Sequence, residues 1–469
     1  MTNKVKSALH ILNNAFSYTN HELYLVGGCV RDLIMNRIPK DWDLTTSATP
    51  DEIKNICKSC KLTYYPTGEK YGTITVIVED FSFETTTFRK DIDYLDGRRP
   101  TKIEFSDNII DDLSRRDFRM NAIAINLNDY LTKGYIKSIQ ELILDPFEGF
   151  KDICNKEINC VGNASERFRE DGLRIMRAIR FATKYDFAIG KETLDAIFEN
   201  HDCLDKISYE RIQNEFNQII MNFNLNVNDL KNEIYLNKWK LTTFIIKKIF
   251  PEMYSLSNYT HNSIYHLYDV FTHSLLVCAG IKTDNLYTKL AALFHDIGKM
   301  NSEITDTKKF TKHFYNHNEE SVIMTARILS RMRYSNDEIT KILTLIKYHD
   351  VELKANKKSV KKLLNKIGFD LFSDFIDLRI SDKLNHIGLS VSDNYKSDML
   401  SIMNDIKLSN ETFSIKNLSI NGNDLIEHGF APSPLFSKIL NECVDLCIEN
   451  PDYNKKEYLL TYICKKYKK

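Results

Sequence analysis

The sequence predicts an α+β unit at the N-terminus, a small mixed sheet with helices, followed by an all-α remainder. Short segments rich in strand-forming residues fill the first 150 positions. After about residue 160 the strand pattern disappears, and apolar residues recur at the three- and four-residue spacing of amphipathic helices. The chain of 469 residues is too long for one compact core. We therefore expect several domains.

The elements of the N-terminal unit can be predicted in order. Residues 1–20 have the apolar spacing of a helix, with Val5, Leu9, Leu12 and Phe16 on one face. Strands are expected over 23–26, 42–45 and 122–127, and a hairpin over 73–88 with its turn at Glu79-Asp80. The unit is expected to end near Pro146.

Two polar stretches divide the rest of the chain. An Asn-rich segment over 222–237 predicts one boundary, and residues 390–417 predict another. Together with the end of the sheet region, these boundaries predict four domains. Their limits are 1–150, 151–225, 226–390 and 391–469.

Composition limits the partners and the compartment. Lys+Arg and Asp+Glu are equal at 64 each, so a nucleic-acid partner requires basic and acidic residues to gather on different surfaces. No apolar run is long enough for a membrane span, and residues 1–14 lack the apolar core of a signal peptide. The ten cysteines are scattered, with a single CxxC at Cys57 and Cys60. We expect free thiols in the cytoplasm.

The first motif follows the expected strand over 23–26. Gly27-Gly28 lets backbone N–H groups approach a phosphate, and Arg31 lies one turn later. Asp41 and Asp43 stand two residues apart, so on a strand they face the same side and can bind the same divalent ions. A phosphate cradle with paired carboxylates is what metal-assisted nucleotidyl transfer needs.

Two further segments are rich in arginine. The first runs from Asp111 to Ala122 and contains Arg115-Arg116-Asp117-Phe118. The second, over 167–181, repeats charged residues every three positions: Asp171, Arg174, Arg177 and Arg180. On one helix, this spacing places Asp171 beside Arg174 and carries the later arginines around toward the phosphates.

An Asp–Arg pair can select bases without a template. Cytosine and adenine both present an exocyclic amine donor beside a ring-nitrogen acceptor, whereas guanine and uracil present the reverse order. A fixed carboxylate accepts from the amine, and a fixed guanidinium donates to the ring nitrogen. Asp171 and Arg174 are the candidate pair.

A second constellation lies in the middle of the chain. His273, His295-Asp296, His317, His349 and Asp382 are spread over successive expected helices. Imidazole and carboxylate groups in this arrangement suit a divalent metal.

Together, the first three motifs resemble the class II nucleotidyltransferase superfamily, which includes CCA-adding tRNA nucleotidyltransferases and bacterial poly(A) polymerases. The histidine pattern resembles the HD phosphohydrolase superfamily. The resemblance implies a nucleotidyltransferase head, a helical neck, an HD-type body with its HD domain over about 262–385, and a tRNA-binding tail. It also implies that ATP and CTP are the substrates and that the tRNA acceptor arm is the partner.

The resemblance assigns roles to the motif residues. Asp41 and Asp43 bind catalytic Mg²⁺; Gly28, Arg31 and Arg116 bind the nucleotide; Asp171 and Arg174 read the base; Arg177 and Arg180 support the triphosphate. His273, His295, Asp296 and Asp382 are the implied ligands of a second divalent metal in the HD domain. Glu84 is the first candidate for a third catalytic carboxylate.

The activity implied is template-independent addition of CCA to the 3′ end of tRNA, with metal-dependent phosphohydrolysis in the HD domain. The alternative on the same fold is an A-adding tRNA nucleotidyltransferase or a poly(A) polymerase. Asn121-Ala122 favours the CCA-adding enzymes, and the loop that includes residues 96–100 argues against addition of C alone. Two alternative hypotheses belong to other functional classes. One is a phosphohydrolase whose head only binds RNA, and the other is a non-catalytic RNA-binding scaffold.

Overall fold

The structure is a computed structural model, and it describes residues 3–92, 102–134, 138–260, 267–306, 311–387, 390–409 and 411–467. The chain forms two compact units. The first comprises residues 1–222 and 232–242, and the second comprises residues 223–231 and 243–469. The predicted loop residues 96–100 lie outside the described residues.

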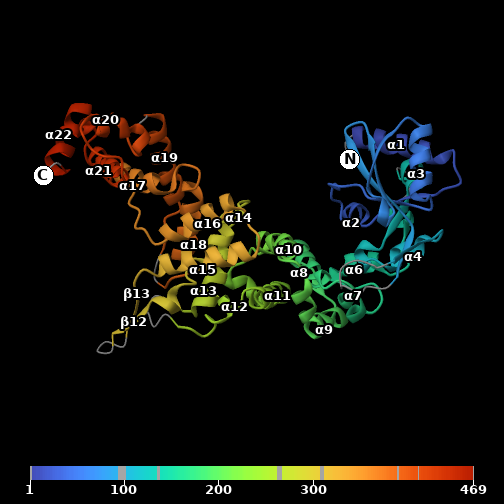
Figure 1. The fold of residues 1–469 in the computed structure, drawn as a ribbon. Helices are drawn as coiled ribbons and strands as arrows, with labels where there is room; N and C mark the ends of the chain where they lie inside the picture. The colour runs from blue at the N-terminus through green and yellow to red at the C-terminus, as the bar shows by residue number, and fades with distance from the viewer. Residues whose placement is uncertain are drawn as a thin grey trace. The chain divides into compact units, whose positions relative to one another are not determined.

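The first unit is built on a seven-stranded sheet in the order β3-β4-β5-β2-β1-β8-β9 (Figure 1, blue to cyan). Its strands are β1 (Leu23–Val26), β2 (Leu44–Thr46), β3 (Thr63–Gly68), β4 (Thr73–Val78), β5 (Phe81–Thr87), β8 (Ala124–Asn126) and β9 (Ile143–Leu144). β2 pairs with β5 in parallel, and the other neighbours in the sheet are antiparallel. The predicted mixed sheet is therefore confirmed.

Apolar periodicity explains the elements that were predicted. Along β4, Ile74, Val76 and Val78 are buried and alternate with partly exposed residues, as expected for a strand with one face in the core. Helix α1 (Asn3–Ser17) buries Leu9 and Leu12 on the face that its spacing defines. The predicted helix, the strand over 23–26 and the hairpin are confirmed.

The second strand differs from the prediction. β2 begins at Leu44, which pairs with Leu25, so Asp41 and Asp43 lie in the segment just before the strand. The backbone of Asp43 is nevertheless fixed, because its carbonyl accepts a hydrogen bond from the N–H of Val26 at 3.1 Å. Asp41 and Asp43 thus lie just before β2, which pairs with β1, the strand that precedes Gly27 and Gly28.

Strands that the sequence did not reveal are short or polar. β3 contains Pro66 and exposed residues, so it lacks an apolar alternation. β6 (Arg89–Ile92) and β7 (Lys102–Phe105) form a separate antiparallel pair. The expectation that strands end near residue 160 is wrong in detail: β10 (Glu157–Ile158) pairs in parallel with β11 (Ala188–Ile189). Two-residue strands are too short to show a period of two.

Helices complete the first unit. They are α2 (Gly28–Ile34), α3 (Pro50–Ser59), α4 (Ile109–Ser114), α5 (Leu127–Lys133), α6 (Gly149–Asn155), α7 (Ala164–Glu170), α8 (Leu173–Tyr185), α9 (Lys191–Glu199), α10 (Tyr209–Asn222) and α11 (Glu233–Ile249), the last divided between the units. α8 and α10 pack together, and Ile179 and Phe216 lie in the resulting core.

The second unit is mainly helical. Its helices are α12 (Pro251–Tyr254), α13 (Val270–Gly280), α14 (Leu286–Phe294), α15 (His317–Arg331), α16 (Asn336–Tyr348), α17 (Lys357–Ile367), α18 (Phe372–Leu384), α19 (Tyr395–Leu408), α20 (Gly422–Glu427), α21 (Leu435–Glu449) and α22 (Lys456–Tyr467). The all-α prediction misses one hairpin, β12 (Glu303–Asp306) with β13 (Thr311–Phe314). Among the described residues, no helix has both the length and the apolar character that crossing a membrane requires.

Asp152 in α6 is buried at a cost to the fold. One carboxylate oxygen accepts from Asn159 Nδ2 at 3.0 Å, while the other is buried without a hydrogen bond to any residue that the structure describes. Burial raises the pKa of Asp152 to about 6. Because this pKa lies above its unfolded value, ionisation destabilises the fold as the pH rises from about 4 to about 6.

We expect Asp152→Asn to increase the free energy of unfolding by about 1–2 kcal/mol at pH 8 and to change it little at pH 4. Urea denaturation at both pH values measures this, and equal effects at both would contradict it.

Candidate functional site

Asp41 and Asp43 immediately precede β2, the central strand of the sheet, and Glu84 lies on the neighbouring strand β5. Burial raises the pKa of Asp43; Arg116 opposes this shift, and the charges of Glu84 and Asp41 add to it. Glu84 precedes Thr85, whose pairing with Leu44 joins β5 to β2. The charge of Asp43 therefore interacts with those of Glu84 and Asp41, although these carboxylates are not among the described groups whose ligand atoms lie close enough together to hold one ion.

Gly27 is required by its backbone conformation and by the arginine that lies against it. Gly27 has a φ of 76°, in the left-handed region that favours glycine. A Cβ at this position would lie 2.9 Å from Nη1 of Arg116. Gly28 then begins α2, which carries Arg31 on its second turn. The local fold thus brings together Gly28, Arg31 and Arg116.

A hydrogen-bond chain links the arginine motifs. Arg31 donates from Nη1 to Asn121 Oδ1 at 2.7 Å, and Asn121 donates from Nδ2 to Asp117 Oδ1 at 3.2 Å. The other oxygen of Asp117 accepts from Arg177 Nε at 2.7 Å. Arg31 also donates to Asp32 at 2.7 Å. Both the oxygen and the nitrogen of the Asn121 side chain therefore form a hydrogen bond.

Asp117 makes a stabilising contribution that depends on pH. Burial alone would raise the pKa of Asp117, but the nearby guanidinium groups, chiefly that of Arg177, outweigh burial and lower the pKa to about 2. A carboxylate whose pKa falls on folding stabilises the protein above its unfolded pKa and loses that contribution as the pH falls toward 2. We expect Asp117→Asn to destabilise the protein by about 2 kcal/mol at pH 7. Urea unfolding of both proteins should show the difference shrinking by pH 3, and a constant difference would contradict the assignment.

The predicted pairing of Asp171 with Arg174 is wrong. Asp171 follows α7 in an extended conformation, with φ −147° and ψ 104°, so it does not share a helix with the arginines of α8. Its Oδ2 accepts from Arg211 Nη2 on α10 at 2.7 Å, while Arg174 Nη1 donates to Glu170 Oε2 at 2.5 Å. The unbroken helix assumed from the spacing overlooked Gly172, which separates the two helices.

Each of the later arginines is likewise held by a carboxylate. Arg180 Nε donates to Glu215 Oε2 at 2.6 Å, and its guanidinium lies 4.2 Å from the ring centroid of Phe181. Arg177 lies 5.6 Å from the same ring. Sequence spacing could find these arginines but not their partners, because the partners lie on other elements.

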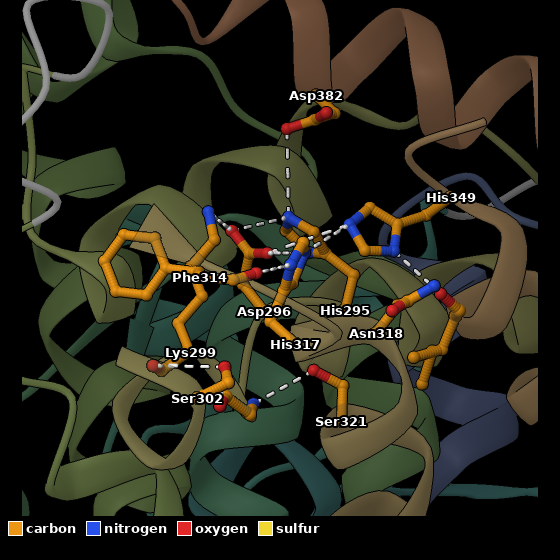
Figure 2. A network of polar contacts seen from close by, with 12 residues as sticks. His295, Asp296, Lys299, Ser302, Phe314, His317, Asn318, Ser321, His349 and Asp382 are labelled. Atoms are coloured by element: carbon orange, nitrogen blue, oxygen red, sulfur yellow. Dashed lines mark hydrogen bonds and ion pairs between the residues drawn. The ribbon is translucent and has the colours of Figure 1, made fainter. Parts of the chain in front are cut away.

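The second unit gathers the predicted HD residues around Asp296. His273 projects from α13, His295 and Asp296 follow α14, and Asp382 lies on α18. His273 Nε2 is 3.0 Å from Asp382 Oδ1, and His295 Nε2 is 3.2 Å from Asp296 Oδ2. Figure 2 shows His295, Asp296 and Asp382 of this group, with Lys299 Nζ donating to Asp296 Oδ2 at 2.6 Å.

His317 and His349 complete a second group on the other oxygen of the same aspartate. Their Nε2 atoms are 3.4 and 3.7 Å from Asp296 Oδ1, and 3.3 Å from each other (Figure 2). The Nδ1 of each lies within hydrogen-bond distance of a backbone carbonyl three residues earlier, at 3.0 and 2.7 Å. With Nδ1 protonated, both Nε2 lone pairs face the centre.

These residues fit a divalent metal centre. His295 Nδ1 contacts the carbonyl of Ala292 at 2.8 Å, which leaves its Nε2 as an acceptor; this atom and Asp296 Oδ1 are buried without hydrogen bonds among the described residues. Burial lowers the pKa of His349 to about 4, so this imidazole is neutral and able to bind a metal. Lone pairs that converge with no hydrogen between them need a cation. The described residues thus contain candidate metal-binding groups.

His386 joins the group although the sequence analysis missed it. It stacks on His273 with ring centroids 5.4 Å apart, and its Nε2 is 3.5 Å from Asp382 Oδ1. The spacing of four residues from Asp382 was a usable signal, because such residues neighbour each other on a helix.

Three known families match separate segments of the chain. The family described as poly A polymerase head domain matches residues 23–159, and the HD domain family matches residues 263–368. One segment of the chain is thus similar to poly A polymerase head domains, and a second segment is similar to HD domains. Between them, residues 186–224 match a family described as a probable RNA and SrmB- binding site of polymerase A. These matches confirm the resemblance drawn from the motifs.

Curated relatives match the N-terminal half. The CCA-adding enzyme of Lactobacillus johnsonii is 43% identical over 210 residues, which are 45% of this chain and 48% of that protein. The CCA-adding enzyme of Enterococcus faecalis is 41% identical over 222 residues, 47% of this chain and 50% of that protein. The chain thus spans about half the length of the curated relatives it matches.

Solved structures share the fold over the whole chain. The CCA-adding enzyme of Bacillus stearothermophilus in complex with CTP superposes with a TM-score of 0.69 at 22% identity, covering 100% of this chain and 98% of that one. The Thermotoga maritima CCA-adding enzyme complexed with tRNA has a TM-score of 0.56 at 19% identity, covering 99% and 96%. The predicted fold class, an α+β head followed by helical parts, is confirmed.

Proposed function

We propose that this protein adds CCA to the 3′ end of tRNA, using CTP and ATP without a template. The observation that carries the proposal is that the charge of Asp43 interacts with those of Asp41, Arg31 and Arg116, in a segment with over 40% identity to CCA-adding enzymes. The tRNA acceptor arm is the proposed partner.

In the head, each residue has a distinct task. Asp41 and Asp43 hold Mg²⁺, with Glu84 as the candidate third carboxylate. When bound there, Mg²⁺ would supply the positive charge that lowers the pKa of the attacking 3′-hydroxyl and screens the triphosphate. Gly28, Arg31 and Arg116 bind the nucleotide, and the carboxylates around the arginines hold each guanidinium in a fixed orientation for the phosphates.

Base selection is proposed for Asp171 and Arg174, assisted by Arg177 and Arg180 near the triphosphate. The structure holds Asp171 through Arg211 and Arg174 through Glu170, and these contacts keep the two groups from pairing with each other. A carboxylate and a guanidinium that are separately anchored can face the amine and the ring nitrogen of C or A.

A test of this selection measures equilibrium binding of the four nucleoside triphosphates to the wild type and to Asp171→Ala. We expect the wild type to favour CTP and ATP over GTP and UTP by about 10-fold or more, as one bidentate base contact provides. The variant should lose the preference, and Asp195→Ala on the exposed face of α9 serves as the control. Equal binding of all four nucleotides by the wild type would contradict the proposal.

For the HD domain we propose metal-dependent phosphohydrolase activity. His273, His295, Asp296 and Asp382 are its metal ligands, and the Nε2 atoms of His317 and His349 offer further ligands on the other side of Asp296. Imidazole-rich sites favour transition metals over Mg²⁺. Mg²⁺ is accordingly proposed for the head alone.

A further inference from the structure

Three cationic side chains of the first unit converge on one aromatic ring. Tyr185 is the last residue of α8, and its ring stacks on Phe181 with centroids 6.0 Å apart. The guanidinium carbons of Arg31 and Arg37 each lie 4.9 Å from the ring centroid of Tyr185, and Lys184 Nζ lies 5.2 Å from it. The cations come from α2, from the segment after it and from α8, so the fold itself assembles the cluster.

The protein supplies too few anions for this cluster. Arg31 pairs with Asp32 at 2.7 Å, whereas no ion pair to Arg37 or Lys184 is found in the part of the chain that the structure describes. Burial and, after it, the charge of Arg31 lower the pKa of Lys184, and the charge of Asp32 opposes this shift. Cation–π contact offsets part of the repulsion, but an anion would offset more.

A second observation concerns the burial of the Tyr185 hydroxyl group. The residue is 6% exposed, and its hydroxyl oxygen is buried with no hydrogen-bond partner among the described residues. An unpartnered buried hydroxyl is unfavourable, and phenylalanine would fill the same space without that cost. Arg37 and Lys184 are exposed side chains with several rotatable bonds, so they can move aside and admit a ligand.

We propose that Tyr185, Arg37 and Lys184 form a phosphate subsite next to Arg31. The hydroxyl and the two cations are donors, and phosphate oxygens are acceptors that carry the missing negative charge. The inference rests on the proposed function, since that function supplies two sources of phosphate beside Arg31. One is the outer phosphates of the nucleotide, and the other is the backbone of the RNA strand being extended.

Tyr185→Phe tests the subsite, because it removes one hydroxyl and nothing else. We expect it to raise the KM of one substrate about 10-fold, the loss expected for one hydrogen bond to a charged group, while the melting temperature stays equal or rises. Lys184→Gln should raise the same KM. Lys191→Gln, an exposed lysine at the start of α9, is the matched control and should change neither KM.

The two sources of phosphate give different results. A raised KM for CTP and ATP assigns the subsite to the nucleotide, and a raised KM for tRNA assigns it to the RNA backbone. Unchanged KM values for both substrates in both variants would overturn the proposal. Calorimetric titration with inorganic pyrophosphate and with tRNA, without turnover, keeps the test separate from the proposed function. If the wild type transfers no nucleotide, binding that Tyr185→Phe weakens still supports the subsite, and binding that it leaves unchanged rejects it.

Discussion

Asp43→Asn is expected to lower the rate of nucleotide transfer by about 10³-fold or more, because several kcal/mol of transition-state stabilisation would depend on the metal that this carboxylate is proposed to hold. Asn keeps the size of the side chain, and the hydrogen bond from Val26 to the backbone carbonyl of Asp43 does not involve the side chain. The fold should therefore survive. Single-turnover incorporation of labelled CTP into tRNA measures the effect, and Asp80→Asn, on the exposed turn between β4 and β5, is the control.

The same carboxylate gives the head a pH dependence. Since burial raises the pKa of Asp43, the metal-binding form is lost at a higher pH than for an ordinary aspartate. The Mg²⁺ concentration needed for half-maximal rate should rise as the pH falls toward this pKa. A retained rate in Asp43→Asn at saturating Mg²⁺ would contradict the assigned role.

Asp296→Asn is expected to abolish metal binding by the HD domain and to leave nucleotide transfer unchanged. Both oxygens of Asp296 face histidine nitrogens, so one substitution affects both ligand groups. The loss of a carboxylate ligand should reduce metal affinity by at least about 100-fold. Metal content of the purified protein, measured by mass spectrometry, gives the readout together with the transfer rate.

Stability has to be controlled in that experiment. The substitution leaves Lys299 without its carboxylate, so a moderate decrease in melting temperature is expected. Asp374→Asn is a matched control, because Asp374 is a buried aspartate on α18 that bonds to Thr288 and Asn285 and lies outside the metal-binding groups. If Asp296→Asn retains its metal, another set of ligands must hold it.

Sequence patterns predicted the elements whose signal is local. The alternation in β4 and the apolar face of α1 reflect burial of one side of one element, and both are confirmed. The histidines could be found because ligand residue types are rare and their order is informative. Placement of Asp296 between two groups of histidines required the packing of α13, α14, α15, α16 and α18.

Pairings between distant segments were beyond sequence reasoning. The i,i+3 spacing predicted Asp171 beside Arg174, but the helix is interrupted between α7 and α8. Arg211 on α10 forms the ion pair with the Asp171 carboxylate instead. Tertiary contacts decided the partner, as they did for Arg180 with Glu215. Strand pairs of two residues, such as β10 with β11, depend in the same way on neighbours and carry no periodicity of their own.

Addition of CCA can be tested by incorporation of each labelled nucleoside triphosphate with Mg²⁺ into three RNAs. These are a tRNA ending at the discriminator base, the same tRNA ending in CC, and an unstructured RNA. We predict addition of C, C and A to the first, of A alone to the second, and little to the third. Addition of A only to the tRNA ending in CC would instead show an A-adding enzyme, and unlimited A on the unstructured RNA would show a poly(A) polymerase.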